Sequence, residues 1–172
     1  MTLSALSRDQ EAEAALDSFL QNLSHPKRVF ALAERAHIRA RTGRLELAIA
    51  DFTSAIQLQP TIELFLIRGQ LQETLGKLEA AAEGYGDGLA KLGNAILLKK
   101  GLIRVQIAQN QYGPALALIN EETARSSVKT PWYLQRAEIL AKMGRSQDSR
   151  RTYEQALDEA NRILGKRSTA MQ

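Results

Sequence analysis

A sparse pattern recurs along the chain every 33 or 34 residues. The pattern is clearest in a series of residues suited to a tight turn, which are Gly43, Gly76, Asn110 and Gly144. A period of this size is typical of stacked helix hairpins, because a single hairpin is too small to bury its own apolar face and depends on its neighbours. The spacing therefore predicts an all-α solenoid of stacked antiparallel helix hairpins, with about nine helices.

The first copy of the pattern shows how one hairpin is built. Its first helix is expected from Val29 to about Thr42, and Gly43 ends it, since glycine readily takes the left-handed backbone of a helix C-terminus. The second helix carries Phe52, and Pro60 closes the unit. The third copy keeps the same phase with Asn at the turn, a residue that also tolerates left-handed backbone.

Small and aromatic residues alternate in phase with the turns. Where two helices cross closely, a side chain larger than a methyl group would push their backbones apart. Close crossings are expected at Ala36, Gly69 and Ala137. The aromatic residues expected to fill the space toward the next hairpin are Phe52, Tyr85 and Tyr153.

These landmarks divide the chain into a half repeat, four repeats and a tail. Residues 1–26 are expected to form an N-terminal capping helix, because Phe19 lies 33 residues before Phe52. Residues 27–165 hold four repeats, of which the third is degenerate, and the last helix serves as the C-terminal cap. Residues 166–172 are expected to fray.

The landmarks resemble the tetratricopeptide repeat family over about residues 27–165. The residues that carry the resemblance are Ala36, Gly43, Ala48, Phe52, Ala55 and Pro60, then Gly69, Gly76, Ala81, Tyr85 and Gly88, then Ala137, Gly144, Tyr153 and Ala156. Ser149 departs from the usual alanine. The resemblance implies a right-handed α-solenoid in which the first helix of each hairpin lines a concave groove that holds peptides.

Composition argues against catalysis. The chain has no cysteine, which excludes thiolate metal sites and cysteine nucleophiles, and its two histidines are not joined by a convergent set of reactive groups. Gly84, Gly86 and Gly88 fall inside an expected helix rather than after a strand, so close helix packing at Gly88 and a flexible or kinked helix around Gly84 and Gly86 are favoured over a phosphate loop. We expect no enzyme activity, no cofactor and no metal site.

The N-terminus carries no signal-peptide pattern, and no apolar run approaches the length of a membrane span. These features favour a soluble protein. The lack of cysteine favours the cytoplasm but leaves the compartment open, because many exported proteins also lack cysteine.

The resemblance also implies a binding face on the first helices. One residue per repeat recurs there, and with its neighbours it could bind the backbone and carboxylates of an extended peptide. The candidate binding residues are Glu34, His37, Arg41, Gln70, Thr74, Lys100, Arg104, Gln135 and Glu138. A merely solvated polar face remains the alternative. The Lys, Asn and Arg clamp that holds chaperone C-termini in this family is absent, so a co-chaperone role is not implied.

The sequence leaves two other kinds of partner open. The chain could self-associate as a subunit of a larger assembly through exposed apolar residues, which we expect at Phe30, Ile67, Leu97, Trp132 and Tyr133. Residues 27–44 contain six Lys and Arg against one Glu, a net charge of +5, and could attract nucleic acid. That segment has a single aromatic residue for base stacking, so a solvated basic end is the default expectation.

Arginines also recur just before the small residue of each clear copy, at Arg35, Arg68 and Arg136. We expect these guanidinium groups to reach nearby carboxylates or carbonyls. A ladder that binds an acidic ligand is the alternative.

Overall fold

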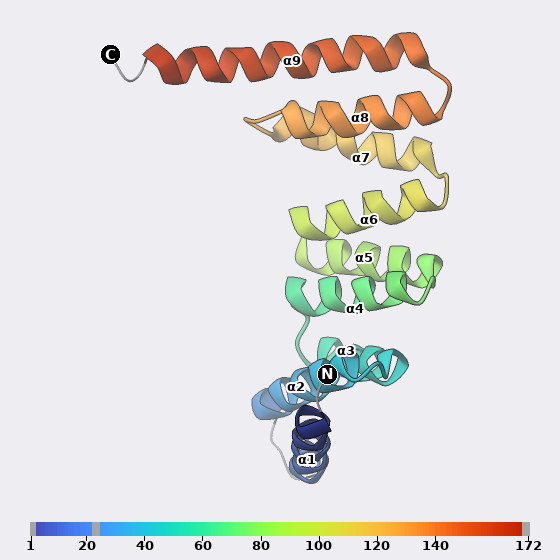
Figure 1. Cartoon of the computed structure of the whole chain (residues 1–172), viewed down its shortest axis with the longest axis vertical. Coiled ribbons are helices and arrows are strands. Elements are labelled where there is room, and N and C mark those ends of the chain that lie inside the picture. Colours follow the sequence, from blue (N-terminus) through green and yellow to red (C-terminus); the bar gives the residue numbers. More distant parts are fainter. Residues whose placement is uncertain (1–2, 22–24, 170–172) are drawn as a thin grey trace. The chain divides into compact units, whose positions relative to one another are not determined.

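The computed structural model describes residues 3–21 and 25–169, and every regular element within them is an α-helix. Figure 1 labels the nine helices of the described residues in chain order. Their bounds are α1 Leu3–Leu20, α2 His25–Arg41, α3 Leu45–Leu58, α4 Ile62–Thr74, α5 Leu78–Leu92, α6 Ile96–Ala108, α7 Tyr112–Arg125, α8 Thr130–Lys142 and α9 Ser146–Thr169. The predicted all-α fold and helix number are confirmed. None of the described helices is both long and apolar enough to cross a lipid bilayer.

The chain divides into two compact units. The N-terminal unit covers residues 1–105 and the C-terminal unit covers residues 106–172, so the boundary lies within α6. The predicted division into a half repeat, four repeats and a tail remains a prediction. Helix α9 continues through residue 169, and residues 170–172 of the predicted frayed tail lie outside the described residues.

The four predicted turns share one geometry. Gly43, Gly76, Asn110 and Gly144 all have left-handed backbone, with φ of 81°, 71°, 57° and 74°. After each of them, the next residue donates its N–H to the carbonyl five positions earlier, at 2.7–2.9 Å. This is the Schellman closure of a helix C-terminus. The third copy therefore keeps the turn of the others, although it lacks most of their other landmarks.

The core of the N-terminal unit is built around Tyr85, which is fully buried. A Cβ atom added at Gly69 would lie 2.4 Å from the Tyr85 ring, and one at Gly101 would lie 2.6 Å from it. Gly88 likewise lies against Phe65 and Leu98. The prediction that small residues permit close helix crossings is confirmed at Gly69, and Gly88 confirms close packing inside a continuous α5.

In the C-terminal unit, the α8–α9 hairpin buries Ala137 and Ser149. The Ser149 hydroxyl donates a hydrogen bond to the carbonyl of Ala137 at 2.8 Å, so this departure from alanine leaves no buried polar group unpaired. Tyr153 was expected to fill the space toward a following hairpin. It is 43% exposed, because no described helix covers that side of α9.

Helix α1 packs on α2 in a different way from the later helices. Phe19, whose phase matches that of the buried Phe52, is 60% exposed. The carboxylates of α1 face α2 instead, and Asp9 and Glu13 are among its buried residues. The contact between these two helices therefore combines these carboxylates with the apolar packing of Leu16 and Leu20.

Candidate functional site

The candidate peptide-binding residues of the N-terminal unit all lie at its surface. Those on α2, α4 and α6 are exposed, and they are Glu34, His37, Arg41, Gln70, Thr74, Lys100 and Arg104. In the C-terminal unit, Glu138 of α8 is exposed and Gln135 is partly buried. The sequence thus identified surface positions, and their role in binding remains a prediction.

Arg104 is the most constrained member of this set. It donates two hydrogen bonds to Glu73, both at 2.7 Å, and the Tyr85 hydroxyl donates to the same carboxylate at 2.6 Å. Burial would raise the pKa of Glu73, but the hydrogen bonds from Arg104 and Tyr85 outweigh it and lower that pKa. Burial and the neighbouring Glu73 carboxylate also raise the pKa of the Tyr85 hydroxyl. Arg104 therefore links α6 to α4 and α5, and its replacement would disturb packing as well as any ligand.

His37 is held by an aromatic contact. Its ring meets the Phe52 ring nearly edge-on, with centroids 5.2 Å apart and an interplanar angle of 82°. Phe52 is fully buried, whereas His37 is exposed. The contact packs the imidazole of this exposed residue against the buried Phe52 ring.

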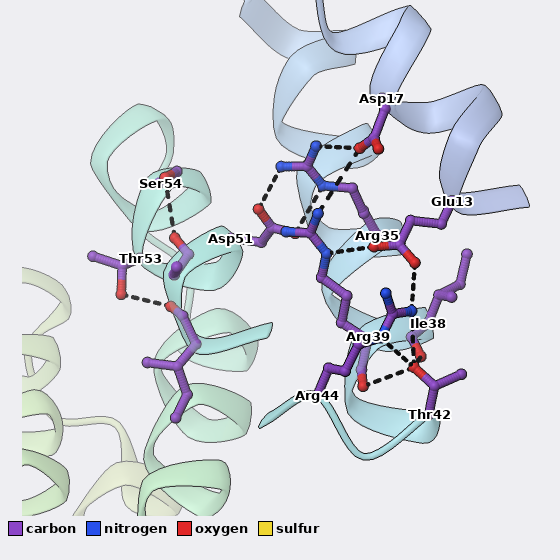
Figure 2. A network of polar contacts seen from close by, with 12 residues as sticks. Glu13, Asp17, Arg35, Ile38, Arg39, Thr42, Arg44, Asp51, Thr53 and Ser54 are labelled. Atoms are coloured by element: carbon purple, nitrogen blue, oxygen red, sulfur yellow. Dashed lines mark hydrogen bonds and ion pairs between the residues drawn. The ribbon is translucent and has the colours of Figure 1, made fainter. Parts of the chain in front are cut away.

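The basic segment at residues 27–44 is largely neutralised by carboxylates. Figure 2 shows the guanidinium groups of α2 beside the acidic residues of α1 and α3. Arg35 donates to Asp51 at 2.6 and 2.9 Å and to Asp17 at 2.6 Å. Arg39 donates to Asp51 and to Glu13, both at 2.8 Å. The structural interpretation of Arg35, with its guanidinium on a carboxylate, is confirmed.

Two further arginines of the segment also bind α1. Arg41 pairs with Asp9, and Arg44 pairs with Glu13. The side chains of these two arginines are 58% and 39% exposed, as expected of a solvated end, but α1 supplies opposite charges that the sequence analysis did not predict. The excess charge that could attract nucleic acid is reduced accordingly.

Sequence reasoning missed the acidic partners, although a spacing signal was present. Asp9 and Arg41 are 32 residues apart, Glu13 and Arg44 are 31 apart, and Glu73 and Arg104 are 31 apart. Each spacing falls just short of one repeat period. Opposite charges separated by this spacing form ion pairs between neighbouring repeats.

The ionic contact of α1 should weaken in acid. Burial would raise the pKa of Glu13, but the hydrogen bonds and charges of Arg39 and Arg44 lower it below its ordinary value of 4.5. The hydrogen bond from Arg41 lowers the pKa of Asp9 below 3.8. Folding lowers both values, so these groups stabilise the fold above the ordinary pKa values and stop doing so as the pH falls through the folded ones.

We therefore predict that Glu13→Gln lowers the thermal midpoint by about 3 °C at pH 7 and by much less at a pH below the folded pKa of Glu13, where the wild-type carboxyl is protonated as well. Differential scanning fluorimetry across this range measures the effect. Glu11→Gln, an exposed change on the same helix, is the control and should leave the profile unchanged. An equal drop for Glu13→Gln at both pH values would contradict the ionic contact.

The predicted apolar interface residues behave unequally. Phe30 is 68% exposed and Leu97 is 49% exposed, whereas Ile67 and Tyr133 are partly buried. Trp132 is only 6% exposed, so the expectation that it lies on the surface is wrong. It lies seven residues before the buried Ile139 and shares that inward face of α8.

Comparison with known proteins agrees with this architecture. Residues 31–62 match the tetratricopeptide repeat family. The crystal structure of MamA aligns with a TM-score of 0.71 and 14% identity, covering 96% of this chain and 98% of that one. YrrB, described as a TPR protein with an unusual peptide-binding site, aligns with a TM-score of 0.69 and 14% identity, covering 98% and 87%. MamA from Desulfovibrio magneticus aligns with a TM-score of 0.68 and 10% identity, covering 89% and 86%. No curated protein matches the chain in sequence.

The hairpins, the shared turns and these alignments define a helical-repeat protein. Residues 31–62 match the tetratricopeptide repeat, as the landmark residues predict, and the chain has the fold of the tetratricopeptide repeat proteins with which it aligns.

Proposed function

We propose that the protein is a non-catalytic interaction module whose N-terminal unit binds an extended protein segment along the exposed side of α2, α4 and α6. The observation that supports this most directly is the set of seven exposed polar residues that these three helices carry. Tetratricopeptide repeats act as protein-interaction scaffolds, and YrrB has a peptide-binding site by its description. An extended peptide offers backbone acceptors and donors that suit such a row.

The best residues for testing this face are those with no structural ion pair. His37 and Gln70 are exposed, and no side-chain hydrogen bond or ion pair holds either of them among the described residues. The double variant His37→Ala and Gln70→Ala is expected to weaken partner capture by about ten-fold while leaving the helicity intact. Affinity purification followed by quantitative mass spectrometry identifies the partner and measures the loss, and circular dichroism checks the fold.

A matched control lies on the second helices of the same hairpins. Gln57 of α3 and Glu83 of α5 are exposed, and their replacement by alanine should leave capture unchanged. Equal retention of partners by both double variants would overturn the proposed face.

Self-association is the second candidate, and the exposure of Phe30 and Leu97 favours it. Exposed large apolar side chains can anchor an interface with another copy. Light scattering at micromolar concentration separates the two functions, because a strict monomer excludes assembly and a dimer that Phe30→Ser dissociates supports it.

A further inference from the structure

The in-phase arginines have three different environments. Arg35 of α2 is bound by Asp17 from the preceding helix and Asp51 from its own hairpin. Asp51 directly precedes Phe52, and the residues that directly precede the matching aromatics Tyr85 and Tyr153 are Gly84 and Thr152. The second and fourth copies therefore lack the carboxylate that holds Arg35.

Arg68 of α4, in the second copy, is partly buried instead of being paired with such a carboxylate. Its guanidinium lies 5.3 Å from the centre of the Phe65 ring. It also lies next to Gly84, where an added Cβ atom would collide with it. Its Nε atom is buried without a hydrogen-bond partner, and burial lowers the pKa of the group.

Arg136 of the fourth copy is different, because it lines an open pocket. No hydrogen bond or ion pair joins its guanidinium to another described residue. The pocket has a volume of about 250 Å³ and lies between α7, α8 and α9, within the C-terminal unit. Arg145 and Arg151 line it together with Arg136, against the single carboxylate of Asp148.

Arg145 is already paired with Asp148 through contacts of 2.7 and 2.9 Å, which leaves Arg136 and Arg151 as the positive groups of the pocket. Two amide side chains, Asn120 and Gln155, add hydrogen-bonding capacity. An adjoining hollow of about 340 Å³ shares Asn120, Arg136 and Gln155 and adds Lys129. The surface around Arg136 thus continues beyond a single side-chain pocket.

We propose that this pocket binds a carboxylate side chain of an acidic protein segment. That carboxylate pairs with Arg136 as Asp51 pairs with Arg35 in the first copy. A planar guanidinium matches a carboxylate through two parallel hydrogen bonds, and the Arg35–Asp51 pair shows that geometry in the first copy. Asp148 in the lining opposes a doubly charged phosphate more strongly than a singly charged carboxylate. The pocket belongs to the C-terminal unit, so it can fail or succeed independently of the peptide face proposed above.

The binding test uses the full chain with a short fluorescent peptide of alternating glutamate and glycine. Its counterpart with glutamine in place of glutamate is the control ligand. We expect saturable binding of the acidic peptide alone, and an affinity at least about ten-fold lower for Arg136→Met. Arg150→Met is the matched control variant, because Arg150 is exposed on α9 and outside this pocket. An equal loss for Arg150→Met, or no binding of the acidic peptide, would overturn the proposal.

Restoring the missing carboxylate gives an independent test. Thr152 lines the pocket and has the same place in its repeat as Asp51 has in the first copy. In Thr152→Asp, the introduced carboxylate should therefore pair with Arg136 and compete with the peptide. We expect this variant to lose the acidic peptide and to shift the side-chain Nε–H resonance of Arg136 as the wild type does when the peptide binds. If Thr152→Asp still binds the peptide at wild-type affinity, the proposal is wrong. Tighter binding of inorganic phosphate or a single-stranded oligonucleotide than of the peptide would also overturn it.

Discussion

Replacing Asp51 by alanine is expected to lower the free energy of unfolding by about 3 kcal/mol. The two carboxylate oxygens accept three hydrogen bonds from Arg35 and Arg39, at 2.6–2.9 Å. All three side chains are largely buried, with exposures of 6% for Asp51, 17% for Arg35 and 14% for Arg39. Removing the shared acceptor leaves two adjacent guanidinium groups with less opposing charge, and each must then rely on the carboxylates of α1.

Urea denaturation followed by circular dichroism measures this loss. Glu46→Ala is the matched control, because Glu46 lies on the same helix and its ion pair with Lys77, at 3.5 Å, is exposed. An exposed pair of this kind contributes less than about 1 kcal/mol. Comparable losses for the two variants would show that burial does not strengthen the Asp51 contacts.

Replacing Tyr85 by alanine is expected to cost about 4 kcal/mol. The side chain is fully buried between Gly69 and Gly101, and neither glycine has a side chain that could move into the space left by the ring. The change also removes the hydroxyl that donates to Glu73. A cavity with such rigid walls collapses poorly, which places the cost toward the upper end for an aromatic truncation.

Tyr153→Ala provides the comparison within the same repeat pattern. Tyr153 has the same phase in the fourth copy but is 43% exposed, so its loss is expected to cost less than about 1 kcal/mol. Thermal and urea unfolding of the two variants test the contrast. Equal destabilisation would mean that position in the repeat, rather than burial, determines the role of the aromatic residue.

The turns and the hairpin period were predictable from the sequence because they depend on single residues. A left-handed backbone strongly favours glycine or asparagine, so Gly43, Gly76, Asn110 and Gly144 report the turn directly, whatever surrounds them. Close crossings are similarly visible, since only a small residue fits at Gly69. The exposed positions of the first helices followed from the same phase.

The environment of the charged side chains was less accessible to sequence reasoning. The fate of Arg39 and Arg41 depends on the carboxylates of α1, a helix that does not repeat the packing of the later ones. The net charge of residues 27–44 is a property of that segment alone. Whether this charge is neutralised depends on the carboxylates of the other segments that pack against it. Trp132 was misplaced for a related reason, because its type is common at interfaces but the inward face of α8 decides its burial.

The packing of Tyr85 constrains the order in which this sequence can change. A larger residue at Gly69 or Gly101 would collide with the tyrosine ring, so either glycine can be replaced without strain only after Tyr85 has become smaller. The smaller residue would first leave a cavity, which makes the intermediate step costly. Three positions on three helices, α4, α5 and α6, are thereby tied together in evolution, and they should vary jointly or not at all.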